Sequence, residues 1–400
     1  MKHYVKLLAS INAHTLLAVI IVLLHNVPLA AQAAGTGTNT SLRTAHYEII
    51  AEPGAAALLP GLAQELELRF ELYNRVFRFN TDLLQTPLRI RLFTNRSSYD
   101  LYLSMRQAIA GTDALYLHYN NHIWRELVVL RDGNDSTMLA SQSFFQFLKA
   151  FIPHPPLWMV EGFGIYFNQI RFDAEEGKLL YEENLSWLDS AKSLGANLIS
   201  PQLILTANVL EQSAQNMRVS SWALVSFMMN SSEHYRTLTE SFLFLTPHNT
   251  AEENSRVVME RFSSWIDFNT LQSELVEYIA LRKTFTEHIT EGRHYLETGN
   301  TLMADYNFRS ANEQRPFHYA PYYYLGLLSY YDNNYDLAEN YFLLSLDNGG
   351  DQALIMFTLG LNAAEADRRV EAIGWLERAA AIDPQRYRAR TEGLIQILRR

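Results

Sequence analysis

The sequence predicts two structural parts in one chain: an α+β domain with a small sheet and helices, followed by an all-helical array of repeats. Residues 46–51 and 88–93 alternate apolar and polar side chains as strands do. Residues 55–79 place leucines and aromatic residues at helical spacing. From residue 285 onward, small residues recur at a constant interval, which is typical of helical repeats.

Composition limits the class of protein. The chain has 400 residues with 48% apolar residues, enough for two or three domains with a buried core. It contains no cysteine, which excludes disulfides, thiolate catalysis and cysteine-ligated zinc. The formal net charge of -10 argues against nonspecific binding to nucleic acids or anionic membranes, because both require basic surface. We therefore expect no nucleic-acid partner.

Residues 1–33 have the pattern of a signal peptide. Lys2 and Lys6 give a positive start, Leu16–Leu24 is a short apolar core, and Ala31–Ala33 fits a small-x-small cleavage site. The sequence thus predicts an exported protein, periplasmic or secreted, with no stable membrane span after cleavage. An uncleaved segment would instead anchor the chain to the membrane. Residues 34–45 are expected to be a flexible N-terminus.

The α+β part is expected over residues 46–284, as an α/β lobe (46–135) and a helical lobe (136–284). In the first lobe, Asn95 is a candidate N-cap for a second helix. Residues 115–130 are expected to form a hairpin that turns at Asn120 and Asn121, a two-residue turn. The order is strand, helix, strand, helix and hairpin.

Two helices are expected next, Ser136–Phe151 and Pro156–Phe167, separated by a proline-rich corner. Residues 155–167 read PPLWMVEGFGIYF. This segment resembles the second helix of the peptidase MA-like (gluzincin-type) family, which carries a Pro-x-Trp-hydrophobic-x-Glu-Gly pattern. The resemblance covers roughly residues 46–171 and, more loosely, the helical part that follows. It implies a zincin-like fold in which Glu161 stands at the position of the third zinc ligand.

The sequence departs from this family where the other zinc ligands belong. The family carries His-Glu-x-x-His upstream, because histidines four residues apart on a helix reach one metal ion and the glutamate accepts a proton from bound water. Laid back from Glu161, the pattern falls on Ser141-Gln142-Ser143-Phe144-Phe145. None of the 12 histidines lies in such a motif. We therefore expect no metal ligands, no zinc or other cofactor, and an inactive peptidase-like domain.

Gln142 and Glu161 are then the remnants of a site. A buried Glu161 without a metal needs hydrogen-bond donors, and Gln142 could donate to it. The alternative is that Glu161 only caps or hydrogen-bonds within the helical pair. His154 in the corner could approach Glu161, although an exposed loop histidine is the simpler interpretation.

The repeats have a period of 34 residues. Gly292, Gly326 and Gly360 share it, and four further sets of positions share the same register. The pattern resembles three tetratricopeptide repeats (285–318, 319–352 and 353–386) followed by a capping helix (387–400). The resemblance implies a solenoid whose first helices line a concave face that binds a protein or peptide. The residues expected on that face are Arg293, Tyr323, Leu327, Tyr330 and Phe357. Alternatively, the aromatic side chains only pack against neighbouring helices or against the preceding domain.

The leading hypothesis from the sequence is an exported protein with a metal-free peptidase-like domain and a tetratricopeptide scaffold, which binds another protein in the cell envelope. One alternative is an active hydrolase with an atypical site around Glu161 and His154. Another is a purely structural envelope scaffold without peptidase ancestry.

Overall fold

A computed structural model describes residues 39–84, 86–108, 111–131, 138–180, 183–208 and 214–399. The predicted signal peptide lies outside these residues. The chain divides into two compact units: the described residues up to Asn184 together with Leu194–Ile279, and Leu185–Ser193 together with the chain from Ala280 onward. The first unit contains a small mixed sheet with helices, and the second is entirely helical in its described residues, as the predicted fold class requires at this level.

The sheet of the first unit has five strands in the order β1-β2-β3-β5-β4. They are β1 (Thr40–Arg43), β2 (Tyr47–Ala51), β3 (Leu88–Phe93), β4 (Ala114–Leu117) and β5 (Glu126–Leu130). The three central strands are parallel, and the edge strands β1 and β4 run antiparallel to their neighbours. Strand β1 lies in the segment that was predicted to be flexible. Its pairing with β2 orders a stretch too short and too polar to show a clear strand pattern.

The predicted hairpin exists as β4 and β5, but its two-residue turn is wrong. Residues 118–125 connect the strands and include a 3-10 turn, His122–Trp124. Asn121 caps this turn by accepting a hydrogen bond from the amide of Ile123 at 3.1 Å. The asparagine therefore begins a short helical turn instead of providing a positive φ for a tight hairpin.

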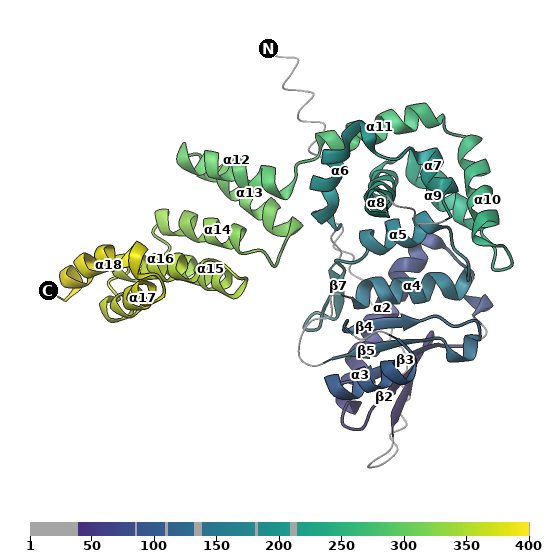
Figure 1. The fold of residues 1–400 in the computed structure, drawn as a ribbon, viewed down its shortest axis with the longest axis horizontal. Coiled ribbons are helices and arrows are strands. Elements are labelled where there is room, and N and C mark those ends of the chain that lie inside the picture. Colours follow the sequence, from purple (N-terminus) through teal and green to yellow (C-terminus); the bar gives the residue numbers. More distant parts are fainter. Residues whose placement is uncertain are drawn as a thin grey trace. The chain divides into compact units, whose positions relative to one another are not determined.

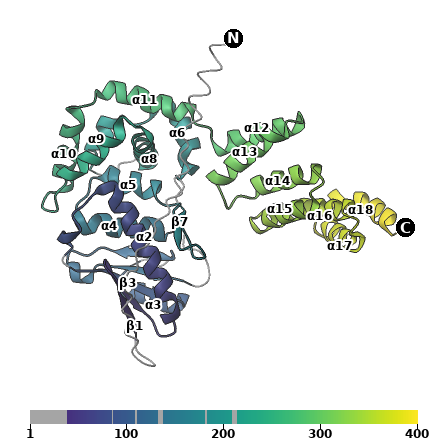
Figure 2. The same cartoon turned by 180° about the vertical axis from the view of Figure 1, so that it is seen from behind.

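Helices cover both faces of the sheet (Figures 1 and 2). One face packs against α2 (Leu59–Phe77) and α4 (Leu139–Phe151), and the other packs against α3 (Arg96–Met105). Asn95 caps α3 as predicted, accepting from the amide of Ser98 at 3.1 Å. Strand β5 is buried at every residue because both of its faces are covered.

Further helices follow in the first unit. The chain turns at the proline corner into α5 (Leu157–Tyr166) and then forms a short hairpin of β6 (Arg171–Asp173) and β7 (Lys178–Leu180). The remaining helices are α7 (Pro201–Thr206), α8 (Ala214–Asn230), α9 (His234–Ser241), α10 (Ala251–Ser263) and α11 (Phe268–Leu281). Helix α8 packs closely on α5: a methyl group placed on Gly162 would lie 2.7 Å from the carbonyl oxygen of Ser221.

The second unit begins with α6 (Leu188–Leu194), a segment that the sequence had assigned to the helical lobe. Lys192 of α6 donates to Glu287 at 2.7 and 2.8 Å, and Asp189 pairs with Arg315 at 2.9 Å. The other helices are α12 (Phe285–Glu297), α13 (Thr301–Gln314), α14 (Tyr319–Tyr331), α15 (Tyr335–Asp347), α16 (Gln352–Glu365), α17 (Arg369–Ile382) and α18 (Pro384–Leu398). They pack in consecutive pairs, α12 with α13, α14 with α15 and α16 with α17.

The contacts between the two helices of a pair recur with the same period of 34 residues. A methyl group on Gly292, Gly326 or Gly360 would come within 2.5, 2.5 and 2.7 Å of the side chains of Phe308, Phe342 and Leu376, respectively. Glycine thus lets the two helices of each pair approach closely. The alanines at positions 304, 338 and 372 are fully buried at the same interface.

A repeated turn joins the two helices of each pair, in addition to the small residues that showed the 34-residue period. Gly299, Asn333 and Asp367 are 34 residues apart and adopt φ values of 78°, 59° and 58°. In each turn, the next residue donates its amide to the carbonyl five positions earlier at 2.8 Å. Glycine, asparagine and aspartate tolerate this left-handed conformation best.

Within the described residues, no helix combines the length and the apolar character needed to cross a membrane.

Candidate functional site

The candidate site is the seam between α4, α5 and the edge strand β4. Ile152 has an extended backbone before Pro153, and Pro156 precedes the first turn of α5, so the prolines end one helix and start the next. Gly164 allows close contact with α4, because a methyl group there would lie 2.7 Å from the ring of Phe145. Both predicted helices are therefore present and in contact.

The remnant residues each bind a different partner. The side-chain oxygen of Gln142 accepts a hydrogen bond from the backbone amide of Tyr116 on β4 at 2.8 Å. Glu161 accepts from Nε of Arg218 on α8 at 2.9 Å. The expected donation from Gln142 to Glu161 is not among the hydrogen bonds of the described residues. Gln142 instead fixes α4 to the exposed edge of the sheet, and Glu161 fixes α5 to α8.

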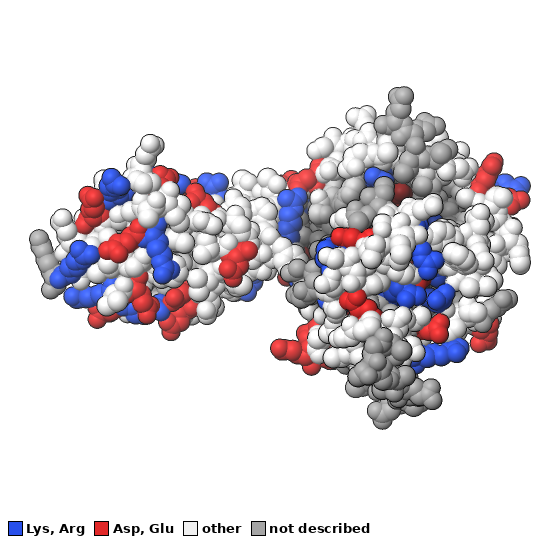
Figure 3. Space-filling model, turned by 60° about the horizontal axis from the view of Figure 1, so that its bottom comes forward, with Lys and Arg blue, Asp and Glu red and all other residues white. Residues whose placement is uncertain are grey.

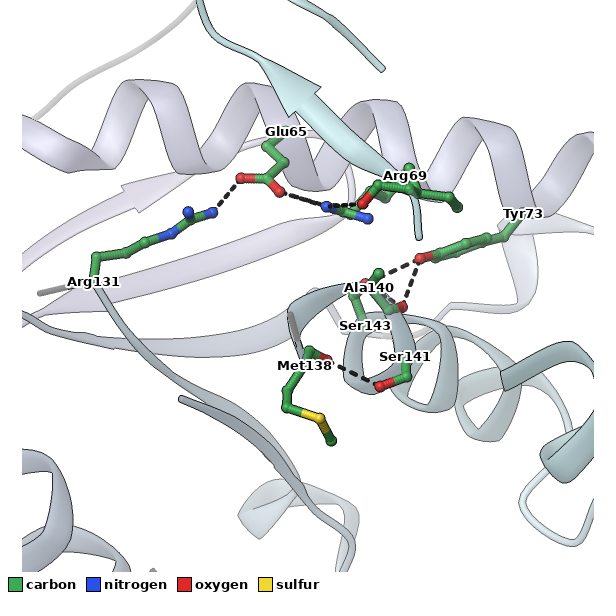
Figure 4. Close-up of polar contacts among 9 residues, drawn as sticks. Glu65, Arg69, Tyr73, Arg131, Met138, Ala140, Ser141 and Ser143 are labelled. Carbon is green, nitrogen blue, oxygen red and sulfur yellow. Dashed lines mark hydrogen bonds and ion pairs between the residues drawn. The ribbon is translucent and has the colours of Figure 1, made fainter. Parts of the chain in front are cut away.

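Ser141 and Phe145 also have structural contacts. The hydroxyl of Ser141 donates to the carbonyl of Met138 at 3.1 Å, within its own helix (Figure 4). The ring of Phe145 lies against Gly164, one turn beyond Glu161 on α5. Over the described residues, no group of three or more histidine, aspartate or glutamate side chains is placed to hold a metal ion.

His154 lies in the corner between α4 and α5. Its side chain is exposed, and its carbonyl accepts a hydrogen bond from Asn254 at 3.2 Å, which holds the corner between α4 and α5. His118 lies just beyond β4, where its Nδ1 is 3.3 Å from the hydroxyl of Tyr116. The pKa of His118 is lowered to about 4, mainly by burial and in addition by the charges of Lys149, Arg125 and His154.

A buried ionic network lies beneath α4, and sequence reasoning missed it. Arg69 is 2% exposed, and its Nε and Nη2 donate to Oε1 of Glu65 at 3.1 and 2.7 Å. Arg131, just after β5, donates to the other oxygen of Glu65. Figure 4 shows both guanidinium groups pointing to this one carboxylate. Burial disfavours the charged form of Arg69, but Glu65 outweighs burial and raises the pKa of Arg69 above its ordinary value.

The network continues into α4 through Tyr73. Its hydroxyl donates to the carbonyl of Ala140 at 2.9 Å and lies 3.1 Å from the hydroxyl of Ser143. Burial raises the pKa of Tyr73, so the phenol stays protonated and acts as a donor. Glu65, Arg69 and Tyr73 share one face of α2 at spacings of four residues, a pattern that could have indicated a buried polar stripe.

A second ionic cluster lies on the opposite face of the sheet. Glu126 is 2% exposed and accepts hydrogen bonds from the hydroxyl of Tyr102 and from Nε of Arg91, the latter at 3.2 Å. Arg106 lies 3.5 Å from the same carboxylate. The carboxylate is compensated by two arginines, so this cluster supports the packing of α3 and offers no free acid or base.

A cavity of about 480 Å³ lies away from the seam. It is lined by residues of α9, α10 and α11 and of the connection between α10 and α11, including His234, Arg236, Glu240, Arg261, Trp265 and Glu274. Glu240 binds Arg236 at 2.6 Å and Arg261 at 3.5 Å, and His234 binds Glu274 at 2.8 Å. These pairs account for most of its charged groups, and none of the remnant residues lines it.

The residues predicted on the repeat face differ in exposure. Arg293 is exposed, whereas Tyr323, Leu327, Tyr330 and Phe357 are half-buried. The two tyrosines and Leu327 pack against a cluster of buried residues: Ala338, Phe342, Ile355 and Leu359. The ring of Phe357 lies 5.0 Å from that of Tyr387 on α18. Four of the five side chains thus contribute to packing and keep a part of their surface exposed.

One face of the molecule shows how charged side chains are distributed. Figure 3 shows basic and acidic side chains interspersed among the described residues of the visible face. No protein-family model matches the chain, and no curated protein is detectably similar to it. The function is therefore inferred from the residues and their contacts.

Proposed function

We propose that this chain is an exported, metal-free relative of the gluzincin-type peptidases, joined to tetratricopeptide repeats, and that it binds a protein or peptide partner through the repeats without catalysis. The observation that carries this proposal is the 34-residue period of contacts and turns in the second unit. A period that fixes both helix packing and turn geometry supports a regular array, and such arrays commonly present an extended binding face.

The contacts of the first helices support a shared face. Helix α12 contacts α14, and α16 contacts α18, in addition to the contacts within each pair. In the proposed solenoid, Arg293, Tyr323, Leu327, Tyr330 and Phe357 line this face. Half-buried aromatic rings that are held by packing lose little conformational freedom when a partner binds, which favours affinity.

The seam between α4 and α5 supports the absence of peptidase chemistry. Gln142 and Glu161 are engaged by Tyr116 and Arg218, and a phenylalanine ring occupies the position expected for the second histidine. A general base must accept a proton from bound water, and the amide of Gln142, at the position of the glutamate base in the family pattern, cannot do so.

A display selection tests the binding proposal. Random peptides on phage are selected against the purified chain, and the affinity of enriched peptides is measured by calorimetry. We expect Arg293→Glu and Tyr330→Ala each to lower affinity about tenfold or more, as central contacts do. Arg378→Glu and Val370→Ala are matched controls, because both residues are exposed on the second helix α17. Failure to enrich any peptide, or equal losses in the controls, would refute the proposal.

A cleavage assay with the same purified chain distinguishes the alternative functions. Incubation with a peptide library followed by mass spectrometry measures turnover. Cleavage that is abolished by Glu161→Gln would support an atypical hydrolase instead. If the chain neither binds nor cleaves any peptide, the structural scaffold becomes the better hypothesis.

A further inference from the structure

Basic side chains converge at the far end of the seam between β4 and α4. They are His118 beyond the end of β4, Arg125 before β5, Lys149 in the last turn of α4, and His154 in the corner. We call these four residues, with the hydroxyl of Tyr116, the basic cluster. Nδ1 of His118 lies 3.3 Å from the hydroxyl of Tyr116, and Nε of Arg125 donates to the carbonyl of the next residue, Tyr119, at 2.7 Å. The charges of Lys149, Arg125 and His154 all lower the pKa of His118.

The elements explain why these residues meet. Gln142 of α4 accepts from the amide of Tyr116, which fixes the helix beside the strand. His118 lies two residues further along the same face of the strand, and Lys149 lies two helical turns beyond Gln142 on the same face of the helix. These steps amount to roughly 7 Å along the strand and roughly 10 Å along the helix. Gln146, one turn beyond Gln142, donates to the carbonyl of Arg89 near the start of β3, so α4 runs in the direction of β4. His118 and Lys149 therefore lie toward the same end of the seam.

The cluster lacks a carboxylate. Lys149 and His118 form no ion pair within the described part of the chain, and Arg125 donates only to the carbonyls of Tyr119 and Asn120, at 2.7 and 3.5 Å. Burial lowers the pKa of Lys149, and the charge of Arg125 lowers it further. A half-buried cation without a counter-ion destabilises the folded chain, so this arrangement needs a compensating function.

Three other groups of arginines in this unit are compensated. Arg69 and Arg131 share Glu65, Arg91 and Arg106 share Glu126, and the two arginines of the cavity share Glu240. The remnant carboxylate, Glu161, is engaged by Arg218. The basic cluster differs from these three groups because no carboxylate of the described residues pairs with it.

We infer that the basic cluster is a binding site for an oxyanion, the carboxylate or phosphate group of a ligand. Lys149 supplies a positive charge that forms no ion pair with another described side chain. Arg125 is held in place by two carbonyls through Nε and Nη2, which leaves Nη1 to donate to the ligand. The hydroxyl of Tyr116 and the neutral ring of His118 add donors that do not repel the cations. A divalent metal ion is disfavoured at the same place.

Calorimetry on the full chain at low ionic strength tests this inference with two probes. Inorganic phosphate represents a free anion, and tri-alanine with a free carboxylate, compared with its C-terminal amide, represents a peptide end. We expect at least one probe to bind, with the amide weaker than the free acid. Arg125→Gln and Lys149→Gln should each lower affinity about tenfold, because each removes a charge-assisted hydrogen bond.

Lys178→Gln is the matched control, since it removes a partly buried lysine of the same unit that is paired with Glu176. An equal loss in this control would overturn the inference, as would the absence of binding by both probes. An NMR titration of His118 in the wild-type chain needs no variant. A bound anion favours the imidazolium and should raise the pKa of His118 by about 1 to 3 pH units. An unchanged pKa at saturating probe would overturn the inference as well.

Discussion

Replacing Glu65 by glutamine should destabilise the first unit strongly. The carboxylate accepts two hydrogen bonds from Arg69 and binds Arg131, and both Glu65 and Arg69 are almost fully buried, at 4% and 2% exposure. The amide keeps the size of the side chain but removes its charge, which leaves a buried guanidinium without a counter-ion. Breaking such a pair from one side costs about 3 to 5 kcal/mol.

Urea unfolding followed by tryptophan fluorescence measures this loss, because Trp158 and Trp222 are fully buried in the same unit. The double variant Glu65→Leu with Arg69→Met removes both charges and should recover most of the stability. Glu176→Gln, which removes an exposed partner of Lys178, should cost less than about 1 kcal/mol. A loss below about 1 kcal/mol in Glu65→Gln, or a double variant as unstable as the single one, would contradict the reasoning.

Three further results are expected. Gly326→Ala should destabilise the second unit by about 1 to 3 kcal/mol, because the new methyl group would lie 2.5 Å from the ring of Phe342. The control Gly374→Ala in α17 meets no atom within 4 Å and should be neutral or stabilising by up to about 1 kcal/mol. Thermal unfolding followed by circular dichroism compares the two variants. The pKa of His118 is lowered to about 4 in the folded chain, so the unfolded chain binds the proton first as pH falls. The free energy of unfolding should therefore decrease from the ordinary histidine pKa of about 6.5 down to pH 4. His118→Asn should reduce this decrease, as measured by urea unfolding across the pH range. Elemental analysis should find well below about 0.5 equivalent of zinc, and one tightly bound equivalent that is lost in Glu161→Ala would refute the metal-free proposal.

Local patterns predicted the elements that local chemistry determines. Asn95 caps α3, the prolines at 155 and 156 separate α4 from α5, and the apolar run after Glu126 forms a strand that is buried on both faces. The turn at Asn120 and Asn121 was wrong, because asparagine suits both a tight hairpin and a helical cap. The contact with Ile123 that decides between them becomes visible only in three dimensions.

Charged partners were harder to predict because they are distant in sequence. Glu65 and Arg69 are four residues apart, so their pairing could have been read from the apolar face of α2. Arg131 and Arg218 are 66 and 57 residues from the carboxylates that they bind, and no spacing rule connects them. The missed turn is different: Gly299, Asn333 and Asp367 were visible at the 34-residue interval and differ only in residue type.

The magnitudes also indicate which contacts would oppose a metal ion at the seam, as the metal-free proposal requires. The pair of Glu161 and Arg218 is 18% and 43% exposed, so breaking it costs about 1 kcal/mol or less, and this pair alone would not prevent Glu161 from binding a cation. The ring of Phe145 against Gly164 is a steric obstacle, because a ligand in its place would require repacking of both helices. A divalent ion beside Gln142 would also lie roughly 10 Å from Lys149, where repulsion reaches about 1 to 3 kcal/mol at effective dielectric constants of about 80 to 20. Packing and the repulsion from Lys149 are thus the larger obstacles to a cation, and the proposed anion site would depend on the same positive charge.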